Sequence, residues 1–314
     1  MSAKSYPRFR VVGPVLLWLC AGLGSGCSIN KIAADGTASL MNEAAPALDG
    51  LWDYELVGAG MPGTILQLEA LWSISPDNEL LSLNLAKAYL GYTLGWVEAE
   101  YEKAYFASDM DKADRLRQRA RLLYLRARNL ALRTMRNRDR GIDEALKSTS
   151  DQALAQYLAK HYKDKDDVAP VFWAGMTWGA AINVSLDQPD LIADAATART
   201  LVERAKALDD GFFNGGAYIF LGSLEAGLPV MMGGNPDKGR EYFEAGLART
   251  ERKNHMLLVM YARTYAVNTQ NRELFVKLLT EVIDAPDLGP AVRLNNKIAR
   301  RRAERYLAQA DQLF

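Results

Sequence analysis

The sequence predicts an all-α protein in which pairs of helices stack on one another. Two observations support this fold class. From about residue 38 to the end, apolar residues recur at helical spacing, and no stretch shows the alternation of a half-buried β-strand. Small and large residues also recur at the spacings found in repeated pairs of helices. One such pair cannot bury its apolar face alone, so we expect neighbouring pairs to share a core.

The N-terminus has the features of an export signal followed by a lipid anchor. A basic start precedes an apolar run over residues 11–24, and two small residues stand directly before Cys27. This order is typical of a secretory signal peptide. Because a cysteine follows the small residues, we expect residues 1–26 to be removed and Cys27 to be acylated, as in bacterial lipoproteins. Residues 27–37 are small and polar, and we expect them to form a lipidated tether.

Two other interpretations of the N-terminus stay open: an ordinary signal peptide with an incidental cysteine, and an uncleaved anchor helix. The apolar run is shorter than the roughly 18 residues that span a bilayer, and Pro14 interrupts it. Gly24 departs from the leucine that usually stands three residues before a lipidated cysteine. Ser28 follows the cysteine in place of an aspartate, which favours anchoring on the periplasmic side of the outer membrane.

Residues 38–314 are expected to form one helical domain, an irregular tetratricopeptide-like solenoid of helical hairpins. The tetratricopeptide unit has roughly 34 residues in two helices that meet at small side chains. Two segments in direct succession have the spacing of its second helix and of the next first helix, and a later segment repeats the second-helix spacing. In order, these positions are Thr64, Leu68, Leu71 and Pro76; Leu85, Ala86 and Tyr89; and Ala198, Val202, Ala205 and Leu208. We predict about four helix pairs and a final helix near residues 290–311.

A long basic helix is expected between about residues 111 and 138. Its arginines do not keep to one stripe, which is typical of a wide solvated face whose arginine stems cover apolar surface. The alternative is a face that binds an anionic ligand, because arginine recognises carboxylates through its planar fork. Arg126 and Arg128 lie beside Tyr124 on this helix, and we take these three residues as a candidate ligand-binding site.

A second candidate site lies in the segment VFWAGMTWGAAINVS, residues 171–185. Trp173, Trp178 and Asn183 share one predicted helix with several glycine and alanine residues. Small residues let another helix approach closely, so packing of the two indoles in the core is one interpretation. The other interpretation is an aromatic-lined ligand cleft in which Asn183 orients the ligand.

Composition and motifs argue against several classes of function. Lys+Arg and Asp+Glu each number 38, so the basic excess expected of a nucleic-acid-binding protein is missing. Cys20 lies in the signal peptide and Cys27 would carry the lipid, which leaves the mature chain no thiol for a disulfide, a metal or nucleophilic catalysis. No phosphate-binding loop, zinc-protease motif or hydrolase nucleophile motif occurs. We therefore expect no enzymatic activity, no cofactor and no metal.

Several segments along the chain carry a family resemblance. One includes a Gly-Gly-Asn-Pro turn that leads into a helix. The segments are residues 59–92, 122–135, 172–183, 229–248 and 293–314. Together they resemble the TatT family, the lipoprotein T components of the tripartite ATP-independent periplasmic (TRAP) transporters, over nearly the whole mature chain. Gly239 departs from the alanine that the family tends to have after the lysine of this turn.

The resemblance implies a tetratricopeptide-type solenoid that assembles as a homotrimer with a central pore. It implies a periplasmic TRAP substrate-binding protein, the P component, as partner, and a small hydrophobic or carboxylate-bearing ligand. It implies no catalytic residue. Two functions follow as hypotheses: a transport accessory lipoprotein that passes ligand to or from its partner, and an envelope scaffold without a small ligand.

Overall fold

The computed structural model describes residues 29–148, 150–228, 230 and 234–314. The predicted all-α class is confirmed, because these residues form helices and turns and contain no strand. Cys27 and the expected signal peptide lie outside the described residues. Over the described ranges, no helix has both the length and the apolar character that crossing a bilayer requires.

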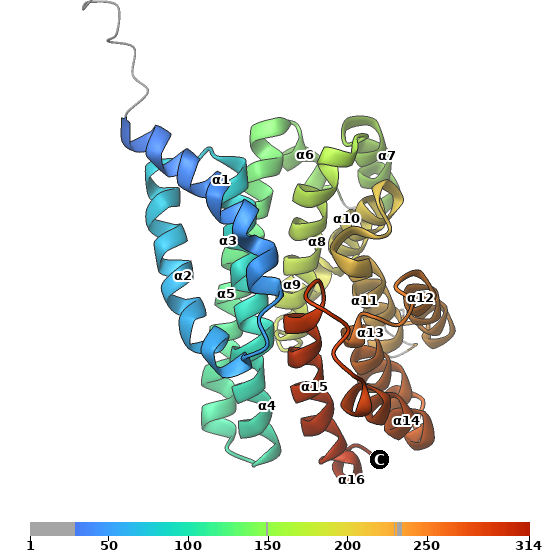
Figure 1. The fold of residues 1–314 in the computed structure, drawn as a ribbon. Helices are drawn as coiled ribbons and strands as arrows, with labels where there is room; N and C mark the ends of the chain where they lie inside the picture. The colour runs from blue at the N-terminus through green and yellow to red at the C-terminus, as the bar shows by residue number, and fades with distance from the viewer. Residues whose placement is uncertain (1–28, 149, 229, 231–233) are drawn as a thin grey trace, which may run out of the picture.

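The helices follow one another through short connections (Figure 1). The first half contains α1 (Ile29–Asp49), α2 (Tyr54–Ile74), α3 (Glu79–Tyr92), the π-helical η1 (Thr93–Val97), α4 (Glu98–Phe106), α5 (Met110–Arg138), α6 (Ile142–Leu146) and α7 (Asp151–His161). The second half contains the 3₁₀ turn η2 (Lys165–Asp167), α8 (Val168–Asn183), α9 (Pro189–Ala193), α10 (Ala195–Leu208), α11 (Phe212–Gly227), α12 (Pro236–Arg249), α13 (His255–Met260), the π-helical η4 (Tyr261–Ala266), α14 (Arg272–Asp284), α15 (Arg293–Leu307) and α16 (Ala310–Leu313).

The expected tether, residues 27–37, is helical where the structure describes it, while its role as a lipidated tether stays a prediction. α1 begins at Ile29 and continues into the domain without a break. Its Asp35 accepts hydrogen bonds from Ser75 Oγ (2.7 Å) and Asn78 Nδ2 (2.6 Å), at the turn between α2 and α3. The small, polar sequence of this segment did not indicate a helix because its stabilising contacts come from residues about 40 positions away.

The centre of the fold is formed by α5, α8 and α10, which pack side by side in chain order (Figure 1). Ala120, Tyr124 and Ala127 lie on one face of α5 and are fully buried, as expected for contact positions between helices. Gly175 of α8 lets α10 approach closely, since a Cβ at this position would lie 2.7 Å from Val202 Cγ2. Small residues therefore set the helix spacing here, while the tetratricopeptide-like repeat itself stays a prediction.

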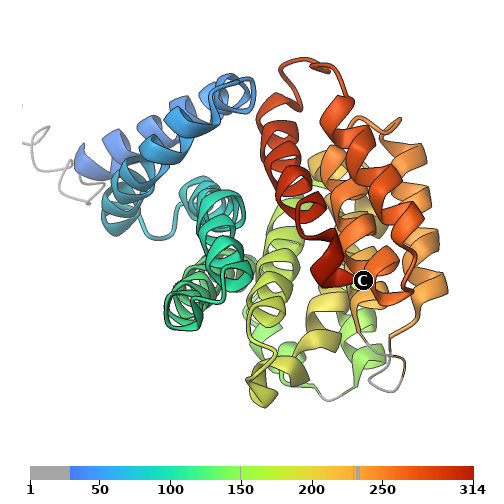
Figure 2. The same ribbon diagram turned by 90° about the horizontal axis from the view of Figure 1, so that it is seen from below.

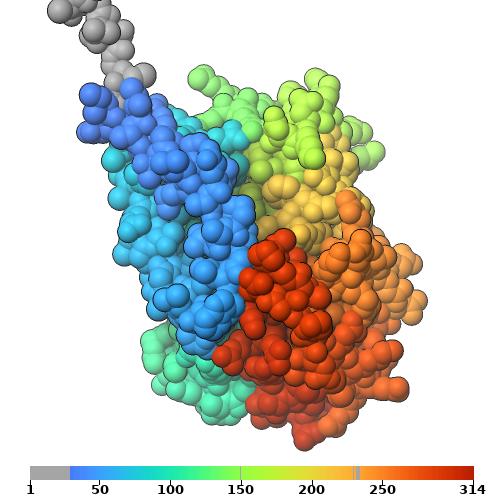
Figure 3. Space-filling model, viewed as in Figure 1, coloured from blue at the N-terminus to red at the C-terminus, as the bar shows by residue number. Residues whose placement is uncertain are grey.

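The last long helix, α15, returns to the N-terminal part of the chain. It contacts α1 and α2, and Figures 2 and 3 show the red C-terminal helix beside the blue N-terminal helices. Arg301 Nη2 lies 2.6 Å from Glu55 Oε1 of α2, and Arg293 Nη1 donates to the Gly50 carbonyl oxygen at 2.9 Å. The two halves of the chain thus face each other, and this arrangement creates the candidate site.

Candidate functional site

A cleft of about 420 Å³ lies between the N-terminal helices α1–α3 and the C-terminal helices α11, α13 and α15, and α8 adds a further wall. Its volume falls within the range of about 300–1,000 Å³ typical of small-molecule sites. The lining is mostly apolar and includes several methionines, whose flexible thioether side chains adapt to ligands of different shape. These methionines are Met41, Met61, Met176, Met256 and Met260.

The start of α11 borders the cleft with an unusual backbone. Phe213, Asn214 and Gly215 have φ angles of 49°, 52° and 74°, in the left-handed region. This region costs a non-glycine residue about 1–2 kcal/mol, and the Asn254 side chain offsets part of that cost by donating to the Asn214 carbonyl oxygen at 2.8 Å. Phe213, Asn214 and Asn254 all line the cleft. Backbone strain of this kind is concentrated at functional sites.

A buried cluster of charges from α4 and α15 forms another part of the cleft wall. Arg302 Nη2 donates to Glu98 Oε2 and to Glu102 Oε1, both at 2.7 Å. Arg305 Nε donates to Glu102 Oε2 at 2.7 Å, and the Tyr306 hydroxyl donates to Glu102 Oε1 at 2.6 Å. Glu98 and Arg302 line the cleft itself.

The two carboxyl groups of this cluster differ in their ionisation. Burial raises the pKa of Glu98 and outweighs the nearby charge of Arg302. For Glu102 burial is again the largest single influence, but the charges of Arg302 and Arg305 and the hydrogen bond from Tyr306 together outweigh it. They lower the pKa of Glu102 to about 2. Glu102 is therefore the ionised centre of the cluster at neutral pH.

The three candidate residues of α5 are engaged within the protein. The buried Tyr124 hydroxyl donates to Glu98 Oε1 at 2.5 Å, which ties it to the charged cluster. Arg126 makes a two-point ion pair with Glu69, at 2.8 and 2.6 Å. The guanidinium of Arg128 lies 4.8 Å from the centroid of the Trp178 ring of α8. None of the three is among the described residues that line the cleft.

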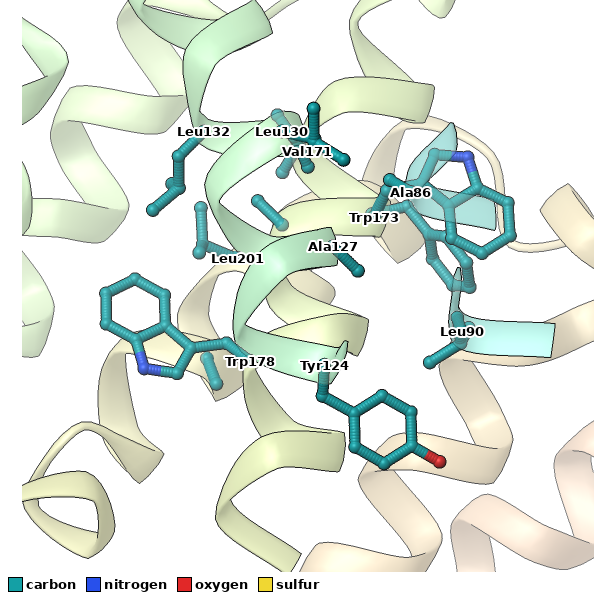
Figure 4. Close-up of a cluster of buried hydrophobic side chains, with 14 of the residues drawn as sticks. Ala86, Leu90, Tyr124, Ala127, Leu130, Leu132, Val171, Trp173, Trp178 and Leu201 are labelled. Carbon is teal, nitrogen blue, oxygen red and sulfur yellow. The ribbon is translucent and has the colours of Figure 1, made fainter. Parts of the chain in front are cut away.

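Of the three candidate residues of α8, the two tryptophans lie in the core and the asparagine lines the cleft. Trp173 and Trp178 are buried, and Figure 4 shows their rings pointing in different directions. Trp173 packs edge-on against Phe213, while Trp178 Nε1 donates to Asp194 Oδ2 at 3.1 Å. Asn183 lines the cleft, and the two indoles do not. This is the geometry of the core-packing interpretation, and Asn183 stays a predicted ligand contact.

Sequence reasoning missed Glu98 and Arg302, although a signal for the arginine was present. Ile298, Arg302 and Tyr306 are spaced by four and lie on one face of α15, which is buried. An arginine in the middle of a buried stripe marks a buried ionic site, because such a side chain is almost never fully buried unless paired. Its partner Glu98 is about 200 positions away, which no local pattern reveals.

The sequence matches a known protein family over the helices that form the cleft, with the exception of α1. A model of the family described as "TRAP transporter T-component" matches residues 52–314. The chain belongs to this family. The resemblance to TatT proteins is thereby confirmed, and the protein has an accessory role in a TRAP transporter. The T-component family is not an enzyme family.

This T-component also has a relative that spans nearly its whole length. A protein of Treponema pallidum (strain Nichols), described as an uncharacterized protein, is 24% identical over 315 residues, which cover 94% of each chain. In the part of the T-component that the structure describes, no three His, Cys, Asp or Glu side chains are grouped so that they could hold a metal ion.

Replacing Trp178 by phenylalanine should lower the free energy of unfolding by about 1–2 kcal/mol, because Asp194 loses a buried donor and a small void forms. Binding in the cleft should not change, since Trp178 is not part of its wall. Urea denaturation measures the first effect, and the amount of small molecule released from purified protein measures the second. Lost ligand retention at unchanged stability would place the indole in a binding site instead.

Proposed function

We propose that this T-component is a lipid-anchored protein on the periplasmic side of the outer membrane. There it binds the periplasmic substrate-binding component of a TRAP transporter and holds a small apolar ligand. The observation that carries the proposal is an apolar cleft of about 420 Å³ in a chain of a transporter family. An accessory protein that receives or hands over a ligand needs such a site, and the methionine-lined walls suit ligands of varied shape.

The proposed anchor rests on the N-terminal sequence. Cys27 would carry the lipid, and α1 begins two residues later at Ile29. A helix rises about 1.5 Å per residue, less than half the rise of an extended chain. A helical start therefore holds the domain closer to the membrane surface than an extended tether would.

Exposed apolar side chains support the proposed protein contacts. Ile32, Leu40, Leu56 and Leu66 of α1 and α2 are each more than 60% exposed, and so is Trp52 between the two helices. Groups of exposed apolar residues mark interaction surfaces. We place the contacts with other protein chains on this hairpin, including those of a homo-oligomer, a trimer according to the family resemblance.

A cleft-filling variant tests the proposal. Ala180 lines the cleft, so Ala180→Trp should place a large ring in it. Leu122 on α5 is 64% exposed and lies outside the cleft, which makes Leu122→Trp the matched control. Purified protein is denatured, and the small molecules released are measured by mass spectrometry. The same proteins are used to capture each TRAP substrate-binding protein encoded in the same genome.

We expect the unmodified protein and Leu122→Trp to retain a small molecule and to capture a substrate-binding protein. Ala180→Trp should retain at least about tenfold less ligand, because the ring occupies its volume. Failure to capture any encoded substrate-binding protein would refute the partner part of the proposal.

The second candidate function is an envelope scaffold without a small ligand, and the exposed side chains of α1 and α2 favour it. If the protein is a scaffold, Ala180→Trp should capture the partner as well as the unmodified protein does, and neither protein should release a small molecule. That combination of results would replace the transport proposal by the scaffold.

A further inference from the structure

The outward face of α1 is apolar over its first part. Ile29, Ile32 and Leu40 are 82%, 61% and 68% exposed. At about 3.6 residues per turn they lie on one side of the helix, together with Ala33 and Gly36. A Cβ at Gly36 would meet nothing within 4 Å. Over roughly three turns, the described part of the chain therefore leaves this apolar face uncovered.

The contacts of α1 with the rest of the domain decide which of its faces points outward. Ala34 and Ala38 are buried, with 1% and 0% of their surface exposed. Asp35 accepts hydrogen bonds from Ser75 and Asn78 at the turn between α2 and α3. Because these contacts lie on the other side of the helix, α1 cannot turn its apolar face inward without losing them.

The charged residues near the start of α1 stay off the apolar face. Between residues 29 and 42 they are Lys31 and Asp35, and both are partly buried on the side towards the protein. The next charged residue is Glu43. Among the described residues no helix is suited to cross a bilayer. A helix with apolar residues on one face is instead suited to lie in the plane of the membrane interface.

The proposed anchor would bring this face to a membrane. Cys27 stands two positions before Ile29, and two residues of extended chain span at most about 7 Å. The polar headgroup region is itself about 5–8 Å deep on each side of the hydrocarbon. A lipid on Cys27 would therefore hold the first turn of α1 at the depth of the headgroups. In Figures 1 and 3 the start of α1 lies at an outer edge of the molecule.

We propose that α1 is a membrane-contacting helix, whose outward face from Ile29 to Leu40 lies among the headgroups of the phospholipid leaflet that holds the Cys27 lipid. This inference rests on the proposed lipid anchor and adds a second contact with the membrane. The second contact fixes the orientation of the domain, because a lipid alone lets the domain rotate. Trp52, Leu56 and Leu66 come later in the α1–α2 hairpin and stay available to protein partners.

Nitroxide spin labels test this contact in the mature full chain, lipidated on Cys27 and reconstituted into vesicles of phosphatidylethanolamine and phosphatidylglycerol. Because the Cys27 thiol carries the lipid, one added cysteine can be labelled selectively. The variant is Ile32→Cys and the matched control is Leu122→Cys of α5, since these side chains are 61% and 64% exposed. Electron paramagnetic resonance measures the collisions of each label with oxygen, which dissolves in lipid, and with a water-soluble nickel chelate.

We expect the ratio of oxygen to nickel collisions to be at least about threefold higher at position 32 than at position 122, because interfacial helices bury their apolar face about 5–10 Å deep. Ala33→Cys lies on the same face and should give the same result, which covers the case that a label at position 32 disturbs α1. Equal ratios at the α1 and α5 positions would overturn the inference.

Other occupants of the face give a different result. If a second copy of the chain or a partner protein covers it, the label at position 32 loses collisions with both oxygen and nickel, which also overturns the inference. Flotation with the vesicles and the mass of the mature N-terminus report on the anchor itself. Equal collision ratios in protein that is lipidated and floats leave the anchor intact. A chain without lipid on Cys27 would refute the anchor and the inference together.

Discussion

Replacing Glu102 by glutamine should lower the free energy of unfolding by about 3–5 kcal/mol, the range measured when one partner of a buried ion pair is removed. Glu102 accepts hydrogen bonds from Arg302, Arg305 and Tyr306. Glutamine has nearly the same shape but no charge, and its amide N–H₂ would face groups that are themselves donors. Arg302 would then keep only Glu98 as a carboxylate partner, and Arg305 would lose the carboxylate that it now contacts.

The effect of this substitution should depend on pH, and its sign follows from the pKa. The folded pKa of Glu102, about 2, lies below its ordinary value of 4.5. A carboxyl group with a lowered pKa stabilises the fold above the ordinary value and loses that contribution as pH falls through the folded one. The difference between the two values corresponds to about 3 kcal/mol at neutral pH. The stability gap between the two proteins should therefore be full above pH 4.5 and shrink towards pH 2.

Urea denaturation of the unmodified protein and of Glu102→Gln across this pH range measures the gap between their free energies of unfolding. The charge of Glu102 is among the influences that raise the pKa of Glu98, so the titration of Glu98 also contributes to the gap. The control is Glu281→Gln, which breaks the more exposed pair with Arg252 and should cost less than about 1 kcal/mol. A gap that stays constant from pH 7 to pH 2 would show that the lost stability does not come from the charge of Glu102.

The helical class and the position of the longest helix were predictable because both depend on local patterns. The expected basic helix near residues 111–138 corresponds to α5, Met110–Arg138. Its contact positions Ala120 and Ala127 are small and apolar, and they are buried as predicted. Capping residues also act locally: Asn235 caps α12 by accepting a hydrogen bond from the Lys238 backbone N–H, and Pro236 follows at the first helical position.

The cleft was not predictable from local patterns, because it depends on the return of α15 to the start of the chain. Arg301 and Glu55, which join α15 to α2, are 246 positions apart. Similarly, nothing in the sequence indicates that Phe213 adopts a left-handed backbone conformation, which non-glycine residues seldom adopt. Of the predicted ligand-binding residues, Asn183 lines the cleft, while Trp173 and Trp178 have the large apolar surface that also suits a helical core.

Two glycine-to-alanine substitutions should change stability in opposite directions. In a helix interior, alanine is favoured over glycine by about 1 kcal/mol. A Cβ at Gly63 of α2 would meet nothing within 4 Å, so Gly63→Ala should stabilise the protein by about 0.5–1 kcal/mol. A Cβ at Gly175 of α8 would lie 2.9 Å from Leu201 Cβ and 3.0 Å from the Ala198 carbonyl oxygen. Gly175→Ala should destabilise the protein by about 1–3 kcal/mol.

Whether Gly175→Ala raises or lowers the free energy of unfolding depends on which atoms the new Cβ would crowd. The Val202 Cγ2 atom, at 2.7 Å, can rotate away, but a Cβ atom and a backbone carbonyl oxygen move only if α10 moves. The shift would disturb the closely packed interface between α8 and α10 in the centre of the fold, and its cost exceeds the gain in helix propensity. Thermal and urea unfolding of Gly63→Ala and Gly175→Ala measure whether each substitution stabilises or destabilises the protein. Equal stabilisation by the two alanines would mean that α8 and α10 are farther apart in solution than their close contact at Gly175 requires.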